Sequence, residues 1–87
     1  KGFAPFLRAL ARQRVPKLWL TSFNIDLEEE PALRLSGQTT DSELIPDYLL
    51  RLSGESVFSG FSFRQLSASR MEERPNIVSF TLASEAE

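Results

Sequence analysis

The sequence predicts an α+β domain, a two-layer sandwich in which a four-stranded antiparallel sheet carries two helices on one face. Apolar residues follow helical spacing in two segments and strand-like spacing in four, in the order α-β-β-α-β-β. The same unit, a helix followed by a hairpin, occurs in each half of the chain, and neither part can bury its apolar face alone. This doubled unit predicts a circularly permuted ferredoxin-like fold with sheet order 3-4-2-1.

The first helix is expected over residues 3–14, because apolar residues recur there on one helical face and Pro16 then stops the helix. We expect this face to pack on the sheet while Arg8 and Arg12 line the polar side. The apolar face comprises Phe3, Phe6, Leu7, Leu10 and Ala11.

The first hairpin is expected over residues 17–27 and 32–39, joined by the acidic break at 28–31. In the first strand the alternation places Phe23, Ile25 and Leu27 on one face. The second strand alternates throughout, with three residues predicted inward and three outward. The inward residues are Leu33, Leu35 and Gly37, and the outward residues are Arg34, Ser36 and Gln38.

The second helix is expected over residues 41–53, with Thr40 and Glu43 at capping-box spacing and Gly54 as its stop. Pro46 lies about one turn too deep for that cap, which predicts an irregular first turn or a later start. The apolar face of this helix comprises Ile45, Tyr48, Leu49 and Leu52.

The second hairpin is expected over residues 57–69 and 76–83. The first of these strands breaks its period of two, which predicts a bulge near Ser59–Gly60 or near Arg64–Leu66. Residues 84–87 are expected to be a frayed tail. In the last strand the predicted inward residues are Val78, Phe80 and Leu82, and the outward ones are Ile77, Ser79 and Thr81.

Composition argues against an enzyme. The chain of 87 residues contains neither cysteine nor histidine, so it lacks thiolates, disulfides and the usual general base. Carboxylates gather at 28–30 and around Asp41, Glu43 and Asp47, where a charged turn and a helix N-terminus account for them. We therefore predict no catalytic residue, no metal site and no cofactor.

A ligand-binding or RNA-binding regulatory domain of ferredoxin-like fold is the alternative function. The segment Ser59–Phe63 resembles the centre of the aromatic strand of an RNA-recognition domain. Against RNA, the segment lacks a leading basic residue, the chain begins with a helix, and the sheet region is acidic. Residues 1–17 contain five basic residues and no acidic one, although the net charge of the chain is −2. A basic start of this kind suits a solvated helix face or a contact with a charged surface.

Taken together, these elements resemble the C-terminal domain of PilN-type fimbrial assembly proteins, which include the MSHA-pilus biogenesis proteins and are related to the secretion protein GspL. The resemblance covers nearly the whole chain, and Pro46 and the three glutamates at 28–30 depart from it. The matching segments are the first helix around Phe6, Leu7 and Leu10, then Lys17–Phe23, Leu33–Thr39, Tyr48–Leu52 with Val57, Phe58 and Phe61, and Val78–Leu82.

The resemblance implies a bitopic bacterial inner-membrane protein, of which residues 1–87 would be a single periplasmic domain. No stretch of the sequence reaches the ~20 apolar residues that span a bilayer, so a membrane anchor is expected upstream of this fragment. The domain would act in the assembly platform of a type IV pilus, MSHA-like, or of a type II secretion machine. Its implied partner is a PilO-like protein or a second copy of itself, without nucleic acid or small-molecule substrate.

The partner surface is predicted at the start of the first strand. One face of the sheet is uncovered, yet this strand is apolar on both faces at Leu18, Trp19 and Leu20. Two phases of this strand are considered. If Trp19, Phe23 and Ile25 face the helices, then Leu18 and Leu20 point outward. If the phase is reversed, Trp19 points outward instead. A bulge near Thr21–Ser22 would instead turn all of these residues inward. We expect Leu18, Trp19 and Leu20 to contribute to a dimer surface beside an open edge.

Overall fold

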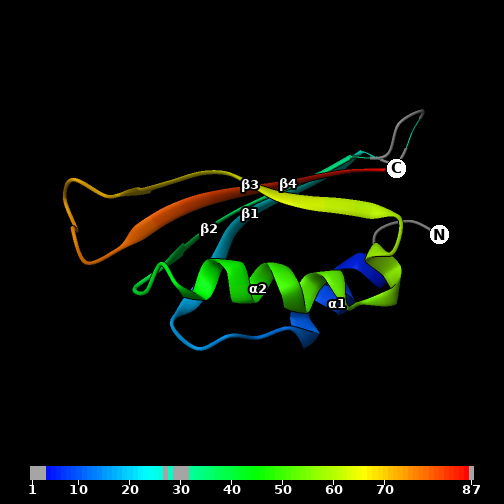
Figure 1. Ribbon diagram of the computed structural model, residues 1–87, viewed down its shortest axis with the longest axis horizontal. Helices are drawn as coiled ribbons and strands as arrows, with labels where there is room; N and C mark the ends of the chain where they lie inside the picture. Colours follow the sequence, from blue (N-terminus) through cyan, green and yellow to red (C-terminus); the bar gives the residue numbers. More distant parts are fainter. Residues whose placement is uncertain (1–3, 27, 29–31, 87) are drawn as a thin grey trace.

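The computed structural model describes residues 4–26, 28 and 32–86. It has two layers, a twisted sheet above and a helical layer below (Figure 1). The elements in chain order are α1 (Ala4–Arg12), β1 (Leu18–Asp26), β2 (Ala32–Thr39), α2 (Leu44–Ser53), the 3₁₀ turn η1 (Ser56–Phe58), β3 (Phe61–Arg70) and β4 (Val78–Ala86).

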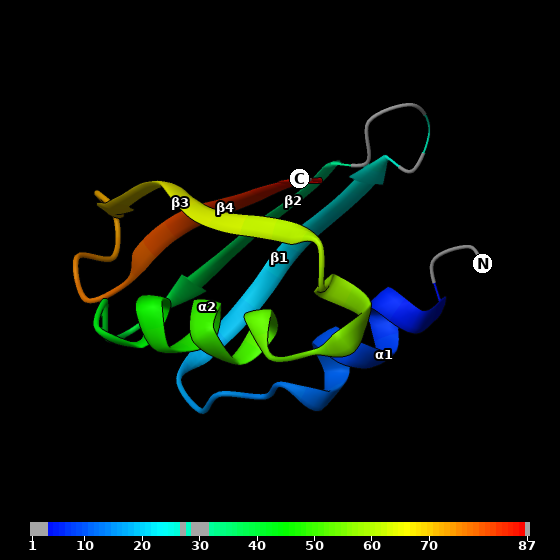
Figure 2. The ribbon, with the colours of Figure 1, turned by 45° about the vertical axis from the view of Figure 1, so that its right-hand side comes forward.

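The sheet has the predicted topology. Its four strands run in the order β1-β2-β4-β3, and each neighbouring pair is antiparallel. Both helices lie against the same face, as a second view makes clear (Figure 2). The predicted fold class is therefore confirmed, and β1 and β3 are the two edge strands.

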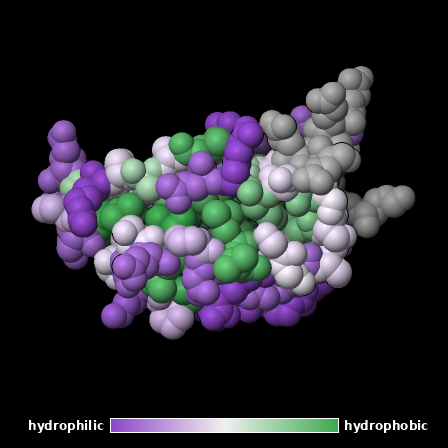
Figure 3. Space-filling model, viewed as in Figure 1, coloured by the Kyte–Doolittle hydropathy of each residue, from purple (hydrophilic) through white to green (hydrophobic). Residues whose placement is uncertain are grey.

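The core lies between the two central strands and the helical layer. The inward residues predicted for β2 and β4 are all buried, as are three of the four predicted for α2. An apolar band between the sheet and α2 is visible on the β3 side of the molecule (Figure 3). The fully buried large side chains include Leu35, Ile45, Tyr48, Leu52, Phe58, Phe80 and Leu82.

Helix α1 is rotated from its predicted phase. Phe6 and Ala9 are buried, whereas Leu7 is 50% exposed and Ala11 is also exposed. The reason is that the Phe6 ring packs against Phe58 of η1 and Phe61 of β3, so this side of α1 faces η1 and the neighbouring part of the sheet. Phe3 falls outside the described residues.

Helix α2 begins later than predicted. Leu44 is its first residue, so Pro46 falls in the first turn, where a missing N–H costs no helical hydrogen bond. The predicted capping box is wrong, because the N-cap residue is Glu43 and no side chain caps it. The Asp41 side chain instead accepts a hydrogen bond from the Glu43 N–H (Oδ1 to N, 3.0 Å), and Gly54 terminates the helix as expected.

The strand predicted from residue 57 begins only at Phe61, because Ser56–Phe58 form the turn η1 and Phe58 fills the core. Of the two predicted bulge positions the second is confirmed, since the register of β3 against β4 shifts between Gln65 and Ser67. After this point β3 is exposed on both sides, and the β3–β4 hairpin extends beyond the helical layer (Figure 1).

Two expectations for the last strand are also wrong. Ile77 was expected to point outward, but it precedes β4 and is buried. The expected frayed tail continues β4 as far as Ala86, and Ser84 is buried opposite Leu33.

Candidate partner interface at the edge strand β1

A β-bulge determines which side chains of β1 face the helices. The pairing of β1 with β2 shifts register between Leu20 and Ser22, so Thr21 is the extra residue. Leu18 and Leu20 before the bulge, and Phe23 and Ile25 after it, therefore all pack against the core. All four side chains remain half-buried, because β1 is an edge strand.

Trp19 lies on the opposite, uncovered face of the sheet and is 39% exposed. Its indole Nε1–H donates a hydrogen bond to Gln38 Oε1 at 3.0 Å, and Gln38 Nε2–H in turn donates to Met71 Sδ at 3.5 Å. The indole is thus held in place by β2, so a rigid aromatic surface stands at one end of an otherwise polar face. Rigid aromatic groups of this kind are typical anchors of protein interfaces.

The chain enters β1 through a constrained turn at Lys17. The φ angle of Lys17 is 71°, in the left-handed region that residues other than glycine rarely adopt. Its carbonyl oxygen accepts hydrogen bonds from Thr39 Oγ1 at 2.8 Å and from the Thr40 N–H at 3.1 Å. These two bonds fix the start of the edge strand against β2.

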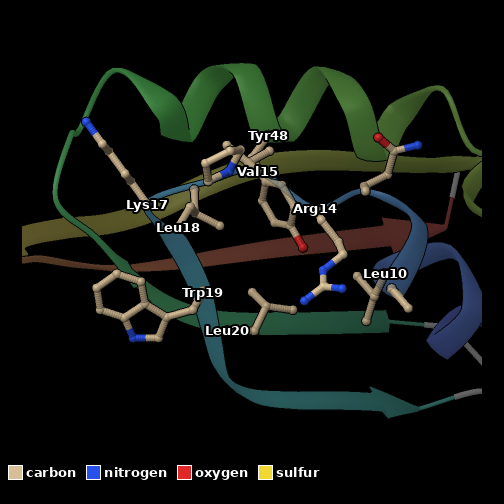
Figure 4. Close-up of a pocket in the computed structure, with 11 residues that line it drawn as sticks. Leu10, Arg14, Val15, Lys17, Leu18, Trp19, Leu20 and Tyr48 are labelled. Carbon is tan, nitrogen blue, oxygen red and sulfur yellow. The ribbon is translucent and has the colours of Figure 1, made fainter.

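A hollow of about 620 Å³ lies on the helix side of β1, between the strand and the linker that follows α1. The Arg14 guanidinium and the Tyr48 hydroxyl point into it (Figure 4). Burial raises the pKa of Tyr48 to about 12, so its hydroxyl is neutral at ordinary pH. The other residues lining the hollow are Leu10, Ala11, Gln13, Val15, Pro16, Lys17, Leu18, Trp19 and Leu20.

Glu55 fastens the end of α1, and with it one wall of the hollow. Its carboxylate accepts hydrogen bonds from Arg12 Nη2 at 2.7 Å, from Arg12 Nε at 3.2 Å and from Gln13 Nε2 at 2.5 Å. The hydrogen bonds from Arg12 and Gln13 lower the pKa of Glu55, and the hydrogen bond to Glu55 together with the charge of Glu55 raises the pKa of Arg12. Glu55 thus holds the linker that borders β1 beside the sheet.

The aromatic residues that resemble an RNA-binding strand face the wrong way for that function. Phe61 and Phe63 pack into the helix side, with ring centroids 6.4 Å and 5.2 Å from that of Phe58. Bases stack on aromatic rings exposed on the open face of such a sheet. Here the rings of Phe61 and Phe63 pack against the core, so this segment does not support RNA binding.

The candidate carboxylates are engaged in local contacts. Asp41 bonds the backbone of Glu43, and Asp47 pairs with Arg51 one turn later at 3.1 Å. In the part of the chain that the structure describes, no three acidic residues gather in a way that could hold a metal ion. The described part of the first cluster, Glu28, donates its backbone N–H to Asp26 Oδ1.

The three residues predicted as a partner surface lie together at the start of β1, but they divide between the two faces. Leu18 and Leu20 border the hollow and Trp19 stands on the open face. The bulge lies where the third alternative placed it, and it turns the leucines, Phe23 and Ile25 inward but leaves Trp19 outward. Arg14 and Tyr48 also border this hollow, and no sequence pattern predicted that they would lie beside β1. Tyr48 was identified only as a core residue, and its hydroxyl is the feature that distinguishes it.

Among the described residues no helix is long and apolar enough to cross a membrane.

Comparison with curated proteins and with solved structures gives no match. The family model described as "Fimbrial assembly protein (PilN)" matches residues 6–86, which include all of β1 to β4 and nearly all of α1. The chain therefore belongs to the PilN family of fimbrial assembly proteins.

Proposed function

We propose that this domain is a structural module of the assembly platform of a type IV pilus, MSHA-like, or of a related type II secretion machine. It acts by associating with proteins and not by catalysis. The observation that carries the proposal is the family match over residues 6–86. Proteins of this family are anchored in the bacterial inner membrane, which supports placing the domain in the periplasm with its membrane anchor upstream.

The proposed docking surface is the start of β1. It combines an open strand edge, half-buried leucines beside a hollow, and the indole of Trp19 fixed by Gln38. Unpaired backbone groups at a sheet edge recruit another strand, while neighbouring pockets select its side chains. The partner is a PilO-like protein of the same machine or a second copy of this chain.

Pilus assembly is tested in the bacterium that encodes this protein. Deleting the gene should abolish surface pili or the secretion that depends on them, and the intact gene should restore them. Normal assembly in the deletion strain would refute the proposed function.

The surface is tested by measuring association of the purified domain with its PilO-like protein. Trp19→Ala should weaken association about tenfold or more, because it removes a fixed aromatic anchor. Leu50→Ala is the matched control, since Leu50 is a 74% exposed residue of α2 that does not line the hollow beside β1. Equal affinities for wild type and Trp19→Ala, with an unchanged circular dichroism spectrum, would rule this surface out.

A further inference from the structure

We propose that β1 pairs with β1 of a second copy of this chain, antiparallel and about a two-fold axis that passes between Thr21 and Ser22. In this register Leu20 lies opposite the second copy's Phe23, Leu18 opposite its Ile25, and Lys17 opposite its Asp26. The inference rests on the proposed role of the β1 edge and names the partner and the geometry. The two sheets would join into one.

The backbone of β1 shows which residues can bond to an added strand. The carbonyls of Lys17 and Trp19 are directed toward β2, since the first accepts from the Thr40 N–H and the second lies against Gly37. Because backbone groups alternate along a strand, the carbonyls of Leu18 and Leu20 are turned toward the open edge.

After the bulge the alternation resumes, shifted by one residue. Ser22 pairs with Ser36, which lies two residues from Gln38 and therefore also faces β1. Phe23 and Ile25 thus take the edge-facing positions that Leu18 and Leu20 take before the bulge. All four edge-facing residues pair with one another in the proposed register.

The side chains agree with this pairing. Residues directly opposite each other in antiparallel strands share one face of the sheet. Leu18, Leu20, Phe23 and Ile25 all lie on the helix side, so each paired contact across the edge is apolar. On the open face the same register places Trp19 opposite the second copy's Asn24.

Neighbouring registers lack this agreement. A slip that places Leu20 opposite the second copy's Ile25 puts Ser22, whose backbone bonds to β2, opposite an edge-facing Phe23. The opposite slip puts Leu20 against the bulged Thr21. Only the proposed register lets both halves of the strand, before and after the bulge, form paired hydrogen bonds.

The charges of β1 are also self-complementary. The strand is preceded by Arg14 and Lys17 and ends at Asp26 with Glu28 beyond it, and all four side chains are exposed. Within the described residues neither Lys17 nor Asp26 forms an ion pair. An antiparallel second copy brings the basic start of one strand to the acidic end of the other, twice in each dimer.

A charge exchange tests the pairing in the 87-residue chain. Self-association is measured by sedimentation equilibrium for wild type, Lys17→Glu, Asp26→Lys and the double variant K17E/D26K. Each single variant should weaken the dimer about three- to thirtyfold, because two exposed pairs become repulsive. The double variant should restore it to within about twofold, since each reversed charge again meets its opposite. An unfolding transition close to that of wild type checks that each variant is folded.

The register is tested by cross-linking, for which the absence of cysteine in the chain is an advantage. Trp19→Cys mixed with Asn24→Cys should form a disulfide-linked dimer, because these residues face each other in the proposed register. Trp19→Cys mixed with Asp26→Cys, two positions further along the strand, should cross-link much more slowly. Faster linkage of the second pair would overturn the register.

A chain that stays monomeric at all concentrations, or a double variant no stronger than the single ones, would overturn the self-pairing. These outcomes differ from failure of the proposed function. If Trp19→Ala still prevents binding of a PilO-like protein while the charge exchange has no effect, the β1 surface stands and its partner is that protein.

Discussion

The ring of Phe80 in β4 lies directly over Gly37 in β2. A Cβ atom added to Gly37 would lie 2.7 Å from the Phe80 ring carbon Cζ and 2.5 Å from the backbone oxygen of Trp19. The glycine thus allows an aromatic side chain to cross the centre of the sheet beside the edge strand. It also ties the packing of the core to the position of the Trp19 backbone.

Gly37→Ala should therefore destabilise the domain by about 1–3 kcal/mol, because the backbone of β1 or the Phe80 ring must move. Urea unfolding followed by the fluorescence of Trp19, the single tryptophan of the chain, measures this. Gly54→Ala is the control, since its Cβ would approach no described atom closer than 3.5 Å. If both variants unfold at the same urea concentration, the packing over Gly37 is looser than described.

Glu55→Gln should lower the free energy of unfolding at neutral pH, because the charge-assisted bonds from Arg12 and Gln13 are lost. The pKa of Glu55 is lowered in the folded chain, so its contribution is complete above the pKa of the unfolded chain, about 4.5. The difference between wild type and variant should shrink as the pH falls below that value. Urea unfolding at neutral pH and at several acidic pH values measures it.

Asp47→Asn is the control for Glu55→Gln. It breaks the exposed pair with Arg51, and such pairs are worth only about 0.3–0.5 kcal/mol. A Glu55→Gln effect as small as that of Asp47→Asn would show that Glu55 does not hold α1 in place.

Tyr48 should titrate well above its ordinary range. It is the single tyrosine of the chain, so ultraviolet absorbance at alkaline pH follows its pKa directly, and we expect a value of about 12. Because burial raises the pKa in the folded state, the domain should lose stability as the pH rises from about 10 to about 12. Titration near 10 in the folded protein would mean that water surrounds the hydroxyl.

Thr39→Val should destabilise the domain by about 1–3 kcal/mol although its shape is preserved. The buried Thr39 hydroxyl donates to the Lys17 carbonyl and accepts from the Asp41 N–H at 3.1 Å, and valine leaves both groups without that partner. Thr39→Ser keeps the hydroxyl and is the control for this loss. Thermal unfolding measures both, and a Thr39→Val variant more stable than Thr39→Ser would contradict the role assigned to the hydroxyl.

Much of the fold follows from local pattern. The clean alternation of Leu33, Leu35 and Gly37 identified β2 and its inward face, because such a pattern fits a strand with one face in the core. The central place of β2 followed from the doubled unit and its likeness to a permuted ferredoxin-like fold. Pro46 likewise predicted an irregular first turn or a later start of α2, and the later start is the outcome.

What the sequence did not determine depends on contacts between distant residues. The phase of α1 is set by Phe6 against Phe58, and its end is fixed by Glu55, 43 positions from Arg12. Helical spacing alone predicted that Leu7 and Ala11 are buried. Such spacing contains no information about which part of the protein the helix packs against. The start of β3 was predicted too early for a related reason. Phe58 packs into the core with the same aromatic cluster, so Ser56–Phe58 form a turn and the strand begins after it.

For the candidate site, the sequence located the unusual segment but not its orientation. Apolar residues on both faces of β1 indicated either an exposed surface or a bulge, and the structure contains both, with Trp19 outward and Leu18 inward. The pairing with β2 determines which side chains of β1 face the helices. The residue types of Thr21 and Ser22 alone do not predict that outcome.

The bulge at Thr21 has a consequence for comparing this chain with other members of its family. A relative that lacks the position of Thr21 keeps the faces of Leu18, Trp19 and Leu20 in a regular strand, because the residue that is lost is the extra one. A relative of equal length without the bulge would instead have the first half of its strand turned over. An ungapped alignment with inverted hydropathy in the three columns before Thr21 should therefore identify a member that lacks the bulge, whereas a one-residue gap should leave that hydropathy pattern unchanged.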